Sequence, residues 1–271
     1  MKKRKLLILF SIFILSSCDV SYFKKYNDAD YRELMSSNCE NFTEIQNLSI
    51  DWMSGDIIIK KSASVKEIQI KETASSTIKD EFKARIKYDE SKNLDINYCA
   101  SNVTLVGLRS KNLEVLIPNE TSLYSLDINI ISGNGVNISN IDVIHEINIK
   151  TNSADVQLEN VNCCDLNIET NSGKISTALC KSPMIDIITN SGNCYLKLND
   201  STKQITINSN SGDCIVDLNE NILGYKIAFN STNGEYKSEF QEVNLYEYSN
   251  GILRIVCNTN SGNLIMNKYN G

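Results

Sequence analysis

Cysteine carries the most distinctive chemistry in this sequence. Cys18 closes the stretch Leu15-Ser16-Ser17-Cys18, which has the form of a bacterial lipobox, where cleavage before the cysteine leaves its thiol as the lipid attachment point. Basic residues 2–5 and an apolar run over residues 6–15, short for a membrane span, precede it. This pattern predicts lipidation at Cys18 and an exported protein that is lipid-anchored to the bacterial cell envelope. The alternative is an uncleaved anchor with an incidental cysteine.

Eight further cysteines follow, and their positions predict two different roles: Cys39, Cys99, Cys163, Cys164, Cys180, Cys194, Cys214 and Cys257. An even number in an exported chain suggests disulfides. Cys180 is the candidate partner of Cys163 or Cys164, because these three lie in longer turns where the backbone geometry is free. Cys194, Cys214 and Cys257 occupy apolar positions, and stacked in-register cysteines do not readily reach the torsion of a disulfide. We expect these three to be reduced core residues.

No other reactive residues assemble into a catalytic or metal-binding motif. His145 is the single histidine, and a lone histidine forms no triad unless a serine and an aspartate converge on it. Residues 217–221 (DLNEN) alternate like a calcium-binding loop, but Ile222 stands where glycine is required. Adjacent cysteines rarely share one tetrahedral zinc ion, and no CxxC spacing occurs. We therefore expect no catalytic residues, no cofactor and no metal ion, with calcium at a turn aspartate as the weak alternative.

The elements that position these residues come from an internal repeat. A polar turn recurs as ETNSGKI at 169–175, ITNSGNC at 188–194, NSNSGDC at 208–214 and NTNSGNL at 258–264. Its small residue falls at steps of 21, 19, 19, 20, 22 and 28 at the following positions: Gly133, Ala154, Gly173, Gly192, Gly212, Gly234 and Gly262. Apolar residues stand seven and five places before each anchor, and two and four places after most of them. Each unit therefore reads as strand, small turn, strand, longer turn.

Units of about twenty residues cannot bury an apolar face alone, but stacked copies can. With strands about 4.8 Å apart, the pattern predicts an all-β fold, a parallel β-helix or β-solenoid. It begins near residue 47, because LSIDWMSGDIII at 48–59 fits the same frame around Gly55. Around Gly133 the apolar residues fall one place later, which predicts a one-residue bulge.

Between residues 60 and 125 the period is lost. EIQIKE, KARIKYDE, NLDINYC and NLEVLIP predict four strands in antiparallel hairpins that close the N-terminal end. The predicted organisation is a signal peptide over 1–17, a tether over 18–46 and a solenoid domain over 47–271. Within that domain, 60–125 forms the capping hairpins and 126–271 the repeat coils.

The asparagine of the recurring turn has one register throughout: Asn152, Asn171, Asn190, Asn210 and Asn260. Stacked asparagines can hydrogen-bond from coil to coil, so we expect a structural corner ladder. The alternative is an exposed polar stripe that recognises a ligand. Since Ala154 replaces glycine once, a strict requirement for positive φ at this corner is not expected.

The T-N-S-G corners, SGDIII near the start, LEVLIP before the repeats and DLNIETNSG resemble the bacterial adhesin-like β-helix proteins of domain-of-unknown-function family 4097, also described as LiaG-like. The resemblance covers about residues 47 to 271. It implies a β-helix on an exported or membrane-tethered protein, and it brings no established catalytic residues. The chain departs from the family in its cysteine count, in Ala154 and in the long final interval.

These observations favour a non-enzymatic envelope lipoprotein, adhesin-like or a scaffold, that is attached to the membrane by its lipid and binds a glycan or protein. A β-helix polysaccharide lyase or hydrolase is one alternative, and acids beside Arg254 would favour it. An envelope-stress regulatory accessory protein is another, implied only by the LiaG-like resemblance. The formal net charge of -6 supplies no basic footprint, so nucleic acid is not an expected partner.

Overall fold

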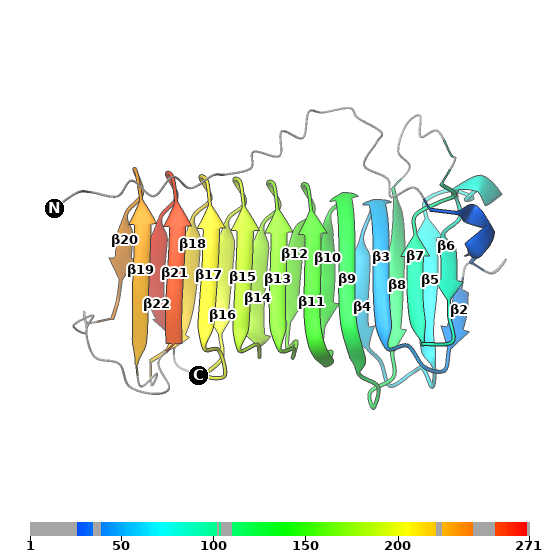
Figure 1. Ribbon diagram of the computed structural model, residues 1–271, viewed down its shortest axis with the longest axis horizontal. Coiled ribbons are helices and arrows are strands. Elements are labelled where there is room, and N and C mark those ends of the chain that lie inside the picture. The colour runs from blue at the N-terminus through cyan, green and yellow to red at the C-terminus, as the bar shows by residue number, and fades with distance from the viewer. Residues whose placement is uncertain are drawn as a thin grey trace.

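The computed structural model describes residues 26–34, 39–101, 103, 110–220, 224–240 and 253–269. Cys18 and the leader before it lie outside the described residues. Within them, the chain forms two sheets of eleven strands that face each other along an elongated molecule (Figure 1). The parallel β-solenoid is confirmed. Among the described residues, no helix has the length and apolar character needed to cross a membrane.

The strands of the two sheets are stacked in the same direction, from the capped end of the molecule to the coil of β19 and β20. The first contains, in that order, β1 (Arg32–Glu33), β6 (Arg85–Tyr88), β7 (Asn93–Asn97), β3 (Asn47–Ser54), β9 (Leu123–Ser132), β11 (Val143–Thr151), β13 (Asp165–Thr170), β15 (Met184–Thr189), β17 (Gln204–Ser209), β21 (Leu253–Thr259) and β19 (Tyr225–Ser231). The second contains β2 (Cys39–Phe42), β5 (Ile68–Ala74), β8 (Lys111–Ile117), β4 (Ile57–Lys61), β10 (Gly135–Ser139), β12 (Asp155–Glu159), β14 (Ile175–Cys180), β16 (Cys194–Leu198), β18 (Cys214–Asn219), β22 (Leu264–Tyr269) and β20 (Tyr236–Ser238). Two short 3-10 helices, η2 (Asp28–Asp30) and η3 (Asp80–Phe82), lie in the N-terminal part.

The core consists of apolar columns that run through the coils. In the first sheet Ile149, Ile168, Ile187 and Ile207 pair in register on β11, β13, β15 and β17. All four side chains are buried. Alternate residues of each strand face outward, as the period of two in the sequence predicts. Stacking equal side chains from coil to coil buries an apolar face that one coil could not bury alone.

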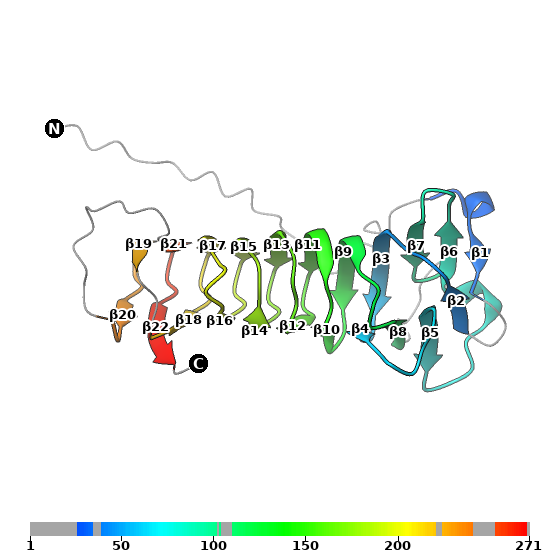
Figure 2. The same cartoon turned by 90° about the horizontal axis from the view of Figure 1, so that it is seen from below.

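The two narrow edges of the solenoid are made by different turns. The T-N-S-G turns, residues 151–154, 170–173, 189–192, 209–212, 231–234 and 259–262, form the upper edge in Figure 1, which we call the corner edge. The longer turns 140–142, 160–164, 181–183 and 199–203, with the strand ends beside them, form the lower edge, which we call the long-turn edge. Figure 2 views the molecule from this lower side.

The predicted bulge near Gly133 is present. Ile130 pairs with Thr151 and Gly135 pairs with Asp155, so residues 131–134 stand opposite the shorter stretch 152–154 of the next corner, one residue fewer. Gly133 has a φ of +147°, a value that side-chain-bearing residues rarely adopt.

The N-terminal end is closed by the four predicted strands, β5, β6, β7 and β8, but only partly as hairpins. β6 and β7 pair antiparallel as neighbours in sequence, and β5 pairs antiparallel with β8. β7 and β8 themselves run parallel to β3 and β4 and complete a further coil. Local alternation could not reveal this arrangement, because a strand has the same pattern in parallel and antiparallel pairing.

The described part of segment 18–46 corrects the prediction of a free tether. β2 pairs antiparallel with β5, and β1 pairs antiparallel with β6. Leu34, Phe42 and Ile45 are buried in the core. This part of the segment therefore belongs to the cap, since it covers the outermost strands with apolar side chains.

The C-terminal coils stack out of sequence order. The last coil, β21 and β22, pairs with β17 and β18 on one side and with β19 and β20 on the other. The coil of residues 225–238 is therefore the outermost, although it precedes the last coil in sequence. Its core positions include the weak members Tyr236 and Ser238, whereas Ile255, Cys257, Leu264 and Met266 of the inner coil are buried. A coil with weaker apolar positions fits the end of the stack, where one side has no further coil among the described residues.

Candidate functional site

The corner edge is built around a buried hydroxyl. Thr189 Oγ1 accepts a hydrogen bond from the backbone N–H of Gly192 at 2.8 Å and donates to the Gly192 carbonyl oxygen at 3.2 Å. The same bond from a backbone N–H to a threonine or serine hydroxyl recurs at the other T-N-S-G turns: Ala154 to Thr151, Gly173 to Thr170, Gly212 to Ser209, Gly234 to Ser231 and Gly262 to Thr259. The hydroxyl satisfies a backbone donor that the tight turn would otherwise leave unpaired.

Glycine is required at the corner by stacking and not by its dihedral angles. Gly173, Gly192 and Gly212 do not have positive φ. A Cβ at Gly192 would overlap the carbonyl oxygen of Gly173 in the preceding coil, and one at Gly173 would overlap that of Ala154. Ala154 itself is tolerated above the bulged corner of Gly133, where the stacking changes by one residue.

The corner asparagines form a ladder. Asn171 Nδ2 donates to Asn152 Oδ1 at 3.2 Å, Asn190 to Asn171 at 3.0 Å and Asn210 to Asn190 at 3.1 Å. Asn260 joins the stack through its backbone N–H, which donates to the Asn210 carbonyl at 3.1 Å. The serines beside them add further bonds, such as Ser191 Oγ to the Asn171 carbonyl at 3.3 Å.

The ladder uses only part of each amide. A primary amide has two N–H donors and an oxygen with two lone pairs, and a ladder contact in each direction uses one donor and one lone pair. Asn190 and Asn210 are exposed, as are the serines that follow them. The remaining donor and acceptor capacity lies along the corner edge at the spacing of the coils, about 4.8 Å. The edge therefore offers a regular, preorganised row of neutral hydrogen-bonding groups.

A second set of ladders lies on the outer face of the first sheet. Asn148 Nδ2 donates to Asp127 Oδ1 at 2.8 Å, and Asn167 Nδ2 donates to Asn148 Oδ1 at 2.8 Å. Nearer the C-terminus, Asn258 donates to Asn208 and Asn230 donates to Asn258, both at 2.9 Å. The register of the strands brings these amides together, so the face is polar without a large charge.

The residues considered for catalysis do not converge. His145 is exposed, stacks on the ring of Tyr124 with 5.4 Å between centroids, and approaches Glu146 at 4.0 Å. Arg254 is exposed, and its register neighbours are Gln204 and Lys226. Among the described residues, neither register partner of Arg254 is an acid, so these two positions do not supply the carboxylates that a polysaccharide-cleaving site would need.

The candidate calcium ligands are engaged by amides. Asp213 Oδ1 accepts from Asn263 Nδ2 at 2.9 Å, and Asp217 Oδ1 accepts from Asn267 Nδ2 at 2.9 Å. Residues 221 and 222 of the loop-like stretch lie outside the described residues. In the part of the chain that is described, no group of three or more His, Cys, Asp or Glu side chains is placed to hold a metal ion.

The three cysteines considered for a disulfide, Cys163, Cys164 and Cys180, are free thiols in this structure. Cys163 and Cys164 point to opposite sides of the chain, because one is buried and the other exposed. Burial raises the pKa of Cys163 to about 12 and also raises that of Cys180. The Cys164 thiol instead donates to the Ile144 carbonyl at 3.1 Å on the long-turn edge.

Cys194, Cys214 and Cys257 are free and buried, as the sequence predicts for core thiols. Cys194 and Cys214 stack in register on β16 and β18. Contact with Cys194 raises the pKa of Cys214, and contact with Cys214 raises that of Cys257. The three sulfurs therefore meet between the two sheets, where they pack as small apolar groups.

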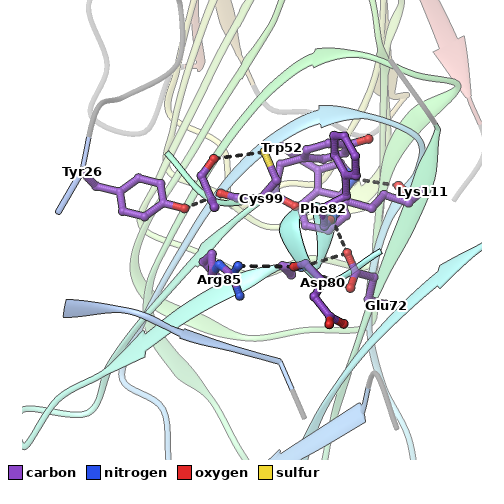
Figure 3. Close-up of polar contacts among 11 residues, drawn as sticks. Tyr26, Trp52, Glu72, Asp80, Phe82, Arg85, Cys99 and Lys111 are labelled. Atoms are coloured by element: carbon purple, nitrogen blue, oxygen red, sulfur yellow. Dashed lines mark hydrogen bonds and ion pairs between the residues drawn. The ribbon is translucent and has the colours of Figure 1, made fainter. Parts of the chain in front are cut away.

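Sequence reasoning missed a buried ion pair in the cap. Lys111 and Glu72 are paired, and their side chains are 3% and 0% exposed (Figure 3). Lys111 Nζ also donates to the carbonyl oxygens of Phe82, at 2.5 Å, and of Tyr98. Burial lowers the pKa of Lys111, while the Glu72 carboxylate opposes that shift. The sequence gives little indication of this ion pair, because the two residues lie 39 positions apart and lysine is normally exposed.

Aromatic rings enclose this ion pair. Lys111 Nζ lies 4.1 Å from the centroid of Tyr98 and 4.9 Å from that of Trp52. A cavity of about 210 Å³ beside it is lined by Ser75, Thr77, Phe82 and other residues of the cap. Since all three N–H groups of the ammonium have protein acceptors, the ion pair serves the packing of the cap, and the lysine is not available as a nucleophile.

Comparison with known proteins identifies the family. Three similar solved structures are a "putative adhesin" from Parabacteroides distasonis ATCC 8503 (10% identity, TM-score 0.47, 84% of this chain and 94% of that one), a "putative adhesin" from Parabacteroides merdae ATCC 43184 (12%, 0.45, 84% and 94%) and a "putative cell adhesion protein" from Clostridium sporogenes ATCC 15579 (14%, 0.39, 88% and 100%). No curated protein matches the chain. The model of the family described as Toastrack DUF4097 matches residues 45–249, which is more than half of the chain. The chain therefore belongs to the Toastrack DUF4097 family.

Proposed function

We propose that this protein is a non-enzymatic, adhesin-like or scaffold lipoprotein of the bacterial cell envelope, which binds a polyhydroxylated ligand such as a glycan along its corner edge. The observation that carries the proposal is the exposed amide ladder, since it leaves unused hydrogen-bonding capacity in a row. A membrane attachment through Cys18 would hold this edge at the cell surface.

The regularity of the edge supports a repetitive ligand. Amide groups donate and accept within one side chain, which suits hydroxyl groups that also do both. The corner backbone is held by the buried hydroxyls and by stacking, so little conformational entropy is lost when a ligand binds. The surroundings of Arg254, with Gln204 and Lys226 as neighbours, give no support to cleavage of such a ligand.

A glycan array with the full chain in detergent tests the proposal. The double variant Asn190→Ala, Asn210→Ala should lose most of the signal of any glycan that the unchanged protein binds. The matched control is Asn148→Ala, Asn167→Ala, which removes laddered amides from the sheet face and leaves the corner edge unchanged. Equal losses in both variants, or retention in the first, would rule out the corner edge as the binding surface.

The anchor is tested separately. Cys18→Ala should abolish metabolic labelling with palmitate and release the protein from membranes, because the thiol is the proposed attachment point. Unchanged labelling would contradict lipidation at Cys18 and leave the binding proposal for the corner edge standing.

A further inference from the structure

Several exposed large apolar side chains lie along the long-turn edge, although Ile188, near the other end of β15, is also 49% exposed. Ile144 is 60% exposed, Leu179 52%, Tyr124 47% and Met184 43%. They belong to consecutive coils, on the side of the molecule that Figure 2 views. Single exposed apolar residues are ordinary, but several aligned along one edge mark an interaction surface.

Cys164 lies at the centre of this row. Its backbone N–H donates to the His145 carbonyl at 2.8 Å in the coil before, and its carbonyl accepts from the Met184 N–H at 3.4 Å in the coil after. The coil of Ile144 therefore precedes that of Cys164 and the coil of Met184 follows it, each about 4.8 Å away along the stack, with Met184 paired in register with Asp165. The thiol is exposed, so it lies on the same surface as its apolar neighbours.

Charge is distributed unevenly about the same centre. Before Cys164, the edge has the exposed Glu120 in the turn before β9, and Glu146 with a side chain that is 37% exposed. After Cys164, it has the half-buried Asp165 beside the thiol, the exposed Lys181 in the next longer turn, and the exposed Lys203 together with the exposed Asp200 in the turn after that. Asp142 is already paired with Lys61. Glu159, the last residue of β12 in the second sheet, is also exposed.

We propose that the long-turn edge is the contact surface for a second copy of this chain, packed antiparallel about a two-fold axis that passes near Cys164. In this arrangement the coil of Ile144 faces the coil of Met184 in the other copy. Glu146 then faces Lys181 of the other copy, and Glu120 faces the turn of Asp200 and Lys203, with the same contacts on both sides of the axis as an isologous interface requires. A parallel arrangement would set acid against acid and lysine against lysine, which disfavours it.

The axis brings the two Cys164 thiols together. In an oxidising envelope they form one intermolecular disulfide by exchange with a disulfide donor. One thiolate attacks a donor sulfur and the first donor thiol leaves. The second Cys164 thiolate then attacks the mixed disulfide and releases the second donor thiol. Two cysteine thiols are oxidised, and one donor disulfide is reduced to two thiols.

Non-reducing electrophoresis of the full chain tests the covalent contact. Membranes are treated with oxidised glutathione and then quenched with N-ethylmaleimide. The unchanged protein and Cys39→Ser should give a dimer band that disappears on reduction, whereas Cys164→Ser should give monomer only. A dimer band that survives in Cys164→Ser, or no dimer in the unchanged protein, would overturn the proposal.

The antiparallel arrangement of the two copies is tested by moving the cysteine to a neighbouring coil in a Cys164→Ser background. When the Ile144→Cys chain and the Met184→Cys chain, distinguished by different tags, are co-expressed, the two-fold axis predicts cross-links between them. Each chain expressed alone should cross-link several-fold less to itself. Both positions are exposed, so these variants should fold. Self-cross-linking of each chain without mixed products would overturn the antiparallel arrangement.

Discussion

The two narrow edges of the solenoid turn the chain by opposite means. At the corner edge the turn repeats nearly unchanged, with a buried hydroxyl such as Thr189 and a glycine whose Cβ would strike the coil below. At the long-turn edge the turns differ in length and sequence, and three consecutive coils adopt positive φ at residues 140, 160 and 179. The buried Thr202 hydroxyl has no hydrogen-bond partner among the described residues. Tight backbone stacking restricts sequence at the first edge. Backbone hydrogen bonds also join the turns of the second edge, such as Asn160 N–H to the Ala178 carbonyl at 2.8 Å, but no glycine-to-carbonyl contact of this kind restricts their sequence.

Thiol reactivity should show the largest difference between the long-turn edge and the interior. With a pKa of about 12, about one Cys163 thiol in ten thousand is ionised at pH 8, and the group is also buried. Cys164 is the next residue but is exposed. After reduction of the native protein, iodoacetamide at pH 8 should modify Cys164 more than about a hundredfold faster than Cys163, measured by a mass-spectrometric time course. Equal rates would mean that this turn does not hold Cys163 in the core.

Much of this contrast could be predicted from sequence, because the corner repeats and the longer turns do not. The strands, the parallel coils and the bulge at Gly133 all follow from the spacing of apolar and small residues. The spacing does not contain the stacking order, since residues 225–238 and 253–269 have the same period and either could be outermost. It also does not contain the pairing of Lys111 with Glu72, which depends on how two distant strands meet. The sequence identifies Cys164 as a cysteine in a longer turn. Whether its side chain is buried or exposed depends on the backbone conformation of that turn, which the sequence pattern does not determine.

Adding one carbon at the corner should destabilise the fold strongly. In Gly192→Ala the new Cβ meets the carbonyl of Gly173, which is backbone and cannot rotate away. We expect a loss of about 3 kcal/mol in the free energy of unfolding, measured by urea denaturation. The control at the long-turn edge, Ser201→Ala, should change it by less than about 0.5 kcal/mol, since Ser201 is exposed. If Gly192→Ala left the free energy of unfolding unchanged, the coils would have to be able to move apart at the corner edge.

Two buried threonines allow the hydroxyl to be compared between the edges. Thr189→Val leaves the Gly192 N–H without its acceptor, so we expect a loss of roughly 1–3 kcal/mol. Thr202→Val removes a buried hydroxyl that has no hydrogen-bond partner in the described part of the chain, so the free energy of unfolding should be unchanged or rise by up to about 1 kcal/mol. Calorimetry of both variants measures the two changes in stability and shows whether they differ. Similar losses would mean that the valine shape, and not the hydrogen bond, determines the effect.

Leu179 links the stability of the long-turn edge to the proposed contact between two copies. It adopts a φ of +56°, which costs leucine roughly 1–2 kcal/mol, and it is half exposed. Asn160 and Asn140 hold the equivalent place in the two preceding coils, joined by a 2.8 Å amide hydrogen bond. Leu179→Asn should therefore raise the free energy of unfolding by roughly 0.5–1 kcal/mol, because asparagine tolerates this conformation and can extend the ladder. The same variant should lower the yield of the Cys164-linked dimer, since it removes an apolar side chain from the contact. Higher stability with an unchanged dimer yield would show that the strained leucine is not retained for association.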